Sequence, residues 1–177
     1  LMSCPLLEIL DIEGWLPDVD QLQQRFGGGN PVIRPFPSIK DLSLSGEAST
    51  IKAFLSGSPQ TLISLYLNIT DNSDSILPSV SLLSNLVHLE IVFDGYREFS
   101  RADLDCISKL SKLQKCHVEW AGPLPTIDGP DSTNDCPWLT DRYFRSWISK
   151  LPQLRELYLA LDSTTITQAA LQALADC

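Results

Sequence analysis

Carboxylate, imidazole and phenol side chains stand at alternate positions in six short stretches of this chain. The carboxylates belong to Asp11, Glu13, Asp41, Glu90, Glu119 and Glu156, and the same stretches contain His88, His117, Tyr66 and Tyr158. Carboxylates attract basic partners by charge complementarity, and exposed tyrosines often anchor protein interfaces. Two histidines and a carboxylate could also hold a divalent metal. We predict no metal site, because the sequence shows no fourth ligand beside them.

The motifs that commonly carry catalysis are missing from the sequence. It contains no GxSxG nucleophile elbow, no HExxH pattern and no supported cysteine–histidine pair. The glycine-rich residues 26–31 lack the Gly-Lys-Ser/Thr ending of a P-loop and the spaced glycines of a dinucleotide site. The sequence therefore predicts a protein that is not an enzyme and that uses no cofactor.

The stretches that carry these polar side chains are copies of one phrase, apolar-x-x-apolar-x-apolar. The six copies begin at Leu7, Ile39, Leu62, Leu86, Leu113 and Leu154. The last three positions of each copy alternate between apolar and variable residues, which is the period of a strand with one buried face. The phrase therefore predicts six short strands.

Apolar residues at helical spacing separate these predicted strands. The clearest runs extend from Leu104 to Leu113, from Phe144 to Leu151 and from Ile166 to Leu174, and shorter ones occupy residues 19–26, 51–55 and 76–83. Ser100 and Asp103 suit a capped helix start. Strand followed by helix, repeated in one direction, predicts an α/β fold with a parallel sheet and helices outside it. Single units cannot bury their own apolar stripe, so neighbours must stack into a curved array with the strands on the inside.

The Leu-x-x-Leu-x-Leu phrase and the strand–helix alternation resemble the leucine-rich repeat family over essentially the whole chain. Cys4-Pro5 before the first phrase and the helical pattern of residues 167–177 are similar to the cysteine-containing subtype, which is frequent in F-box leucine-rich-repeat proteins. The resemblance implies a solenoid of about six repeats, a curved arc with the parallel sheet on its concave face and helices on its convex face. Residues 1–177 would form one such domain, with irregular loops at 27–35 and 121–138. The family's usual asparagine after the strand is replaced in every copy, so we expect irregular turns.

Side chains between the buried strand positions would form columns on the concave face, where a partner can reach them. The candidate binding residues are Asp11, Asp41, Tyr66, His88, Glu90, His117, Glu119, Glu156 and Tyr158. Carboxylates outnumber lysine on this face, which indicates a basic peptide or protein as the partner; a merely solvated polar face is the alternative. Trp138 in the second loop is a further candidate, which either folds over the edge of the array or contacts a partner.

Composition narrows the classes of partner and the compartment. Lys+Arg 13 against Asp+Glu 22 gives a net charge of −9, which repels nucleic acid. No apolar run reaches the roughly 20 residues that cross a bilayer, and the chain starts without a secretory signal pattern. The 5 cysteines show no CxxC spacing, which favours a reduced intracellular setting, cytoplasmic or nuclear. Because residues 174–177 occupy the same repeat phase as residues 1–4, we expect a segment of a longer array; a small solenoid that dimerises through its ends is the alternative.

In F-box leucine-rich-repeat proteins the repeats recruit substrates to a ubiquitin ligase. The resemblance therefore implies a protein-interaction scaffold, the substrate-recognition repeats of such a ligase subunit. A Skp-type adaptor would be reached only through an F-box, which these 177 residues do not include. The repeat domain of a sensor or receptor, or a regulator that docks on an enzyme such as a small GTPase, are alternatives. Asn68-Ile69-Thr70 is a glycosylation sequon, which would matter in a secreted protein.

Overall fold

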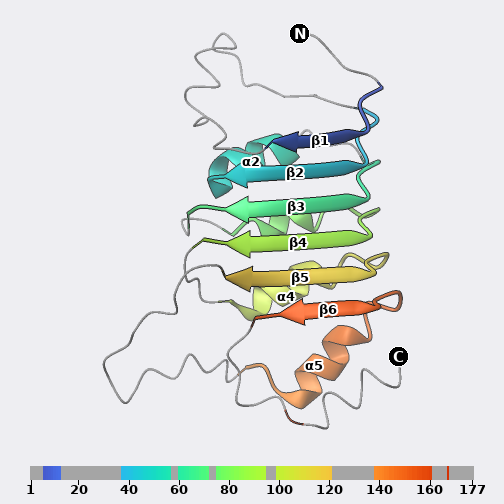
Figure 1. Cartoon of the computed structure of the whole chain (residues 1–177). Coiled ribbons are helices and arrows are strands. Elements are labelled where there is room, and N and C mark those ends of the chain that lie inside the picture. The colour runs from blue at the N-terminus through green and yellow to red at the C-terminus, as the bar shows by residue number, and fades with distance from the viewer. Residues whose placement is uncertain are drawn as a thin grey trace.

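The last four residues of each of the six phrases lie in a strand, as predicted. The computed structural model describes residues 6–12, 37–56, 60–71, 75–94, 99–120, 138–160 and 167 (Figure 1). The elements in these ranges are β1 (Ile9–Ile12), β2 (Asp41–Gly46), α2 (Ala48–Leu55), β3 (Ser64–Ile69), α3 (Leu77–Val80), β4 (His88–Phe93), α4 (Arg101–Ile107), β5 (Lys115–Trp120), α5 (Asp141–Ile148) and β6 (Glu156–Leu159). The described part of the chain is thus an α/β structure of six strands and four helices.

All six strands pair in parallel and in sequence order, β1-β2-β3-β4-β5-β6. The same contact joins every neighbouring pair where the strands begin. The carbonyl before one strand accepts hydrogen bonds from two successive amides at the start of the next. Val87 O, for example, accepts from Gln114 N at 2.8 Å and from Lys115 N at 3.1 Å. Five junctions share this geometry, so successive strands stack with no shift in register and the predicted parallel sheet is confirmed.

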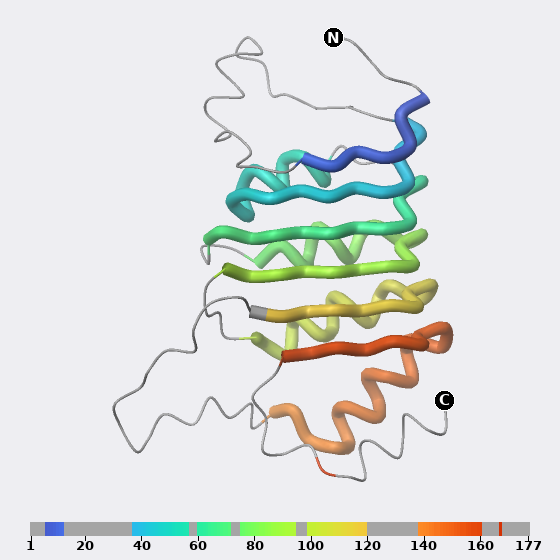
Figure 2. The backbone as a smooth tube through the Cα atoms, viewed as in Figure 1, coloured from blue at the N-terminus to red at the C-terminus, as the bar shows by residue number. Residues whose placement is uncertain are grey.

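Alternation along the strands separates a buried face from an open one. The inward-facing apolar side chains of β2 to β5 that the structure describes are at most 3% exposed and form one continuous core with the helices. In the two outer strands Leu10, Ile12, Leu157 and Leu159 are only partly buried. The helices α2 and α4 lie behind the sheet in Figures 1 and 2, and α3 contacts both. We call the opposite side of the sheet the open face, since no helix of the described residues covers it.

Polar side chains accept hydrogen bonds from backbone amides at the starts of helices. Ser100 and Asp103 form the predicted capping box of α4, with Asp103 Oδ2 accepting from Ser100 N at 2.9 Å. Asp103 is only 2% exposed, and its other oxygen accepts from Ser75 Oγ of the preceding repeat at 2.8 Å. The start of α2 has no capping side chain of its own, but Asp71 Oδ1 accepts from Ala48 N at 2.6 Å. Polar contacts at helix starts therefore connect neighbouring repeats.

All four predicted helical runs that the structure describes differ in extent from it. The run from Leu104 to Leu113 corresponds to α4 over Arg101–Ile107, and the run from Phe144 to Leu151 corresponds to α5 over Asp141–Ile148. The run at 51–55 begins earlier, at Ala48, whereas the run at 76–83 is an α-helix only over Leu77–Val80. Beyond Val80 the chain continues with tighter i→i+3 bonds, including Leu83 N to Val80 O at 3.0 Å. The predicted helices at 19–26 and from Ile166, the position of Glu13 and the loops at 27–35 and 121–137 lie outside the described residues.

The last helix among the described residues is α5. Thr140 caps this helix by accepting from Tyr143 N at 3.3 Å. Trp147 is 1% exposed, and its Nε1 donates to Leu104 O at 2.7 Å, which joins α5 to α4. Among the helices that the structure describes, none has the length and apolar character needed to cross a lipid bilayer.

Candidate functional site

The strand register lines up the candidate binding residues in rows across the open face. The first row is Ile9, Asp41, Ser64, His88, Lys115 and Glu156; the middle row is Asp11, Ser43, Tyr66, Glu90, His117 and Tyr158; the third row includes Ser45, Asn68, Val92 and Glu119. Parallel pairing without slippage keeps each row aligned, at about 4.8 Å between neighbouring strands. These rows are the columns that the sequence predicts.

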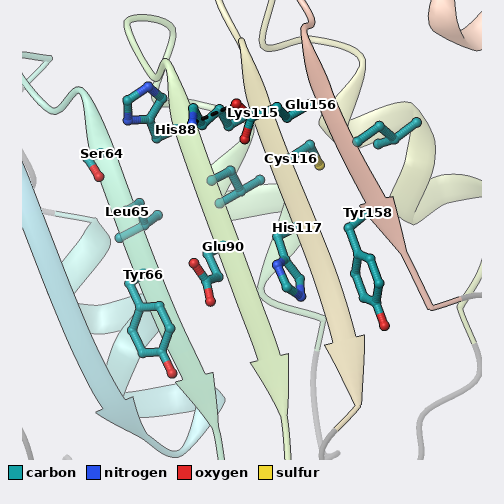
Figure 3. A pocket seen from close by; sticks show the side chains of 12 residues that line it. Ser64, Leu65, Tyr66, His88, Glu90, Lys115, Cys116, His117, Glu156 and Tyr158 are labelled. Atoms are coloured by element: carbon teal, nitrogen blue, oxygen red, sulfur yellow. Dashed lines mark ion pairs between the residues drawn. The ribbon is translucent and has the colours of Figure 1, made fainter. Parts of the chain in front are cut away.

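A shallow groove of about 440 Å³ crosses strands β3 to β6 on the open face (Figure 3). Its lining includes six of the candidate residues: Tyr66, His88, Glu90, His117, Glu156 and Tyr158. Asp11 and Asp41 lie on the same face but on β1 and β2, outside the groove. Glu119 lies in the third row, beside the groove. The structure thus brings together two thirds of the predicted surface residues and leaves the N-terminal carboxylates apart from them.

The first-row side of the groove is neutralised by its own ion pair. Lys115 Nζ lies 2.7 Å from Glu156 Oε1, and Figure 3 shows this pair across β5 and β6. Both side chains are more than half exposed, so the pair contributes less than about 1 kcal/mol to stability. Lys115 is the one lysine in these rows, and it is paired with Glu156. The carboxylates of the middle and third rows therefore have no lysine of the rows as a partner.

Two tyrosines flank the part of the middle row that lines the groove. Tyr66 is 38% exposed and Tyr158 is 52% exposed. The His117 ring lies against Tyr158 with 4.4 Å between ring centroids. His117 Nε2 is also 3.0 Å from Glu119 Oε2, but its orientation does not satisfy hydrogen-bond geometry, so this contact is electrostatic when the imidazole is protonated. The rings thus stand on either side of Glu90 (Figure 3).

The electrostatic field at Tyr66 is negative. Partial burial raises the pKa of the Tyr66 phenol, and the carboxylates of Glu90, Glu119, Asp94 and Asp11 raise this pKa further. The phenol therefore remains a neutral hydrogen-bond donor at physiological pH. Asp94 was not among the predicted site residues. It directly follows β4, and its place in the turn after the strand was the only signal for it.

The cysteine under the groove is not a nucleophile. Cys116 is 2% exposed, and desolvation raises the pKa of its thiol to about 12. A thiol of this kind stays protonated at neutral pH and packs as a small apolar residue. Within the described ranges, no three His, Cys, Asp or Glu side chains are grouped so that they could hold a metal ion. The groove offers carboxylate acceptors, phenol donors and aromatic faces, which are groups that bind.

Two residues depart from the expected exposure of binding positions. Val92 shares the third row with Asn68 and Glu119, yet it is only 8% exposed, because a short aliphatic side chain lies between longer neighbours. Trp138 is half-buried, packs against the core and meets the Tyr143 ring edge-on at 5.7 Å. The residue does not line the groove.

No family model, no curated protein and no solved structure matches this chain. Its function is therefore argued from the open face itself. Three features of that face matter: an uncovered parallel sheet, carboxylates in excess of cations, and two exposed tyrosines.

Proposed function

We propose that the chain is a leucine-rich-repeat solenoid and that the open face is its concave surface. The repeated Leu-x-x-Leu-x-Leu phrase, the unshifted register and the identical contact at five strand junctions support this assignment. Strands stacked about 4.8 Å apart on one side, opposite wider helices on the other, produce curvature with the strands inside.

On this fold the chain binds a protein or peptide through the open face. The observation that carries the proposal is the middle row, in which Tyr66, Glu90, His117 and Tyr158 are held side by side where no described helix covers them. A polar row that served solubility alone would not need two large aromatic side chains in water. Tyrosine is among the residues that most often anchor protein interfaces. A rigid sheet presents these groups at little entropic cost on binding.

Within this class, we propose the substrate-recognition repeats of an F-box-type ubiquitin ligase subunit, acting inside the cell. The resemblance of the repeats supports this role. The sequon at Asn68 favours it over a secreted receptor, since Asn68 lies half-buried in the third row and a glycan there would cover the open face. A Skp-type adaptor would contact an F-box and leave the open face to the substrate.

Comparative capture tests the binding surface. The purified chain and a Tyr66→Ala/Tyr158→Ala variant are immobilised, and proteins retained from cell extract are compared by mass spectrometry. The control variant, Lys109→Ala/Arg142→Ala, changes two exposed residues on the helical side. We expect proteins that the wild type and the control retain and the tyrosine variant loses. If all three chains retain the same proteins, the open face is not the binding surface.

Ubiquitin-ligase membership has its own test. The protein expressed at its natural full length should co-purify with a Skp-type adaptor, and the captured protein should be ubiquitylated less when the tyrosine variant replaces the wild type. A full-length protein that never associates with such an adaptor refutes the ligase role and leaves the binding surface unaffected.

A further inference from the structure

One carboxylate in the middle of the groove has no basic side chain paired with it among the residues that the structure describes. Glu156 is compensated by Lys115 at 2.7 Å, whereas no lysine or arginine among the described residues forms an ion pair with Glu90. Glu90 lies between Tyr66 on β3 and His117 on β5, and Glu119 is one row further along β5. The acidic part of the groove is thus its middle, with aromatic rings on both sides.

The shape of this place suits one long side chain. The groove volume of about 440 Å³ falls within the range of about 300–1,000 Å³ seen for ligand sites. Tyr66 forms one side, the His117–Tyr158 pair forms the other, and the Glu90 carboxylate lies between them in Figure 3. A group that fits must carry positive charge for the carboxylate and a flat face for the rings.

We propose, on the premise that the open face binds a protein, that this groove receives an arginine side chain from an extended basic segment of the partner. The guanidinium pairs with the Glu90 carboxylate and stacks on the Tyr66 ring. A guanidinium is planar, presents its donors as a fork that matches a carboxylate, and stacks on aromatic faces. A lysine ammonium supplies the charge without the flat face, so it satisfies only half of the site.

The carboxylates around Tyr66 exclude an acidic ligand and favour a basic one. Glu119 and Asp94 extend the negative field at Tyr66 beyond Glu90. A basic segment carrying further lysines or arginines is therefore steered to the groove, and its association slows as salt screens the field.

Peptide titration tests the assignment. The ¹⁵N-labelled chain is titrated with Ac-Gly-Ser-Arg-Ser-Gly-amide, and with the same peptide carrying citrulline or lysine in place of arginine. Citrulline keeps the shape of arginine but has no charge. We expect the arginine peptide to shift the backbone amide signals of Tyr66, Glu90 and His117, and to bind about tenfold more tightly than the citrulline peptide. The lysine peptide should fall between them.

Two matched variants test whether Glu90 is the carboxylate that binds the arginine peptide. Glu90→Gln should weaken arginine-peptide binding about tenfold. Asp41→Asn makes the same chemical change on the same face outside the groove and should alter it by less than about twofold, as expected for a distant screened charge. Equal loss in the two variants would mean that the face attracts cations without a site, and this overturns the proposal. Equal binding of the arginine peptide and either counterpart overturns it as well.

Failure here is distinguishable from failure of the binding function. If no peptide binds while the tyrosine variant still loses its captured proteins, the open face binds a partner and the arginine assignment is wrong. If peptides bind as expected but no protein depends on Tyr66 and Tyr158, the groove is an arginine site and the partner function is wrong.

Discussion

Truncating two neighbouring residues of β3 separates the roles of the two sheet faces. Leu65 is 1% exposed and stacks in register between Leu42 of β2 and Leu89 of β4, both also buried. Leu65→Ala leaves a cavity in the middle of the core, where the surrounding strands cannot collapse, so we expect it to lower the free energy of unfolding by about 3–4 kcal/mol. Tyr66 points the other way and is 38% exposed. Tyr66→Ala removes only cross-strand contacts, and the expected loss is below about 1 kcal/mol.

Urea unfolding followed by far-UV circular dichroism measures both losses. The unfolding midpoint of Leu65→Ala should fall well below that of Tyr66→Ala, with similar slopes of unfolding free energy against urea. Ser43→Ala, another middle-row residue, serves as a control with an expected change below about 0.5 kcal/mol. If Tyr66→Ala destabilises the chain as much as Leu65→Ala, the strand faces are reversed by one residue and the proposed binding surface disappears with them.

Three further predictions concern groups other than the polar side chains of the groove. Asp103→Ala removes a buried carboxylate that caps α4 and bonds to the preceding repeat, so the free energy of unfolding should fall by about 2–4 kcal/mol in the same assay; a loss under about 0.5 kcal/mol would contradict the capping role. Burial, and then the hydrogen bond to Asp105, raise the pKa of Tyr143 from about 10 to about 12. The folded state therefore favours the neutral phenol, and the stability that this supplies is complete below pH 10 and is lost as the pH rises toward 12. The free energy of unfolding of Tyr143→Phe should therefore fall less steeply with pH than that of the wild type between pH 10 and 12. Identical pH profiles of the two proteins would contradict the raised pKa. Iodoacetamide at pH 8 should alkylate half-buried Cys106 much faster than Cys116, whose thiol has a pKa of about 12; peptide mass mapping measures both rates, and equal rates would mean that Cys116 is accessible.

The local sequence pattern was sufficient to predict the strands and most of the helix starts. The apolar-x-apolar alternation depends only on which side chains avoid water, so it predicted the six strands and their facing. Ser100 and Asp103 cap α4 through bonds within four residues, which sequence spacing expresses directly. The α3 run was longer in prediction than in the structure, because the tighter bonds after Val80 depend on backbone geometry that apolar spacing does not encode.

Contacts between residues far apart in sequence could not be predicted in the same way. The pairing of Lys115 with Glu156 and the hydrogen bond from Ser75 Oγ to Asp103 Oδ1 both join separate repeats. Each needs a particular rotamer and a particular loop length, and loop length varies from repeat to repeat. The burial of Val92 likewise depends on its two neighbours in the row. Of these contacts, the pairing of Lys115 with Glu156 decides which carboxylate of the open face is already paired.

The amino-acid sequence determined that polar and aromatic side chains of six strands share one side, because strand periodicity and the cost of exposing leucine leave no other arrangement. Only the tertiary structure decided how those side chains combine. It placed Lys115 on Glu156, His117 on Tyr158, and Glu90 between two rings with no ion pair to a lysine or arginine of the described residues. The physical reason is range: burial is a property of each residue and its near neighbours, whereas charge pairing and ring stacking depend on distances set by the stacking of whole repeats.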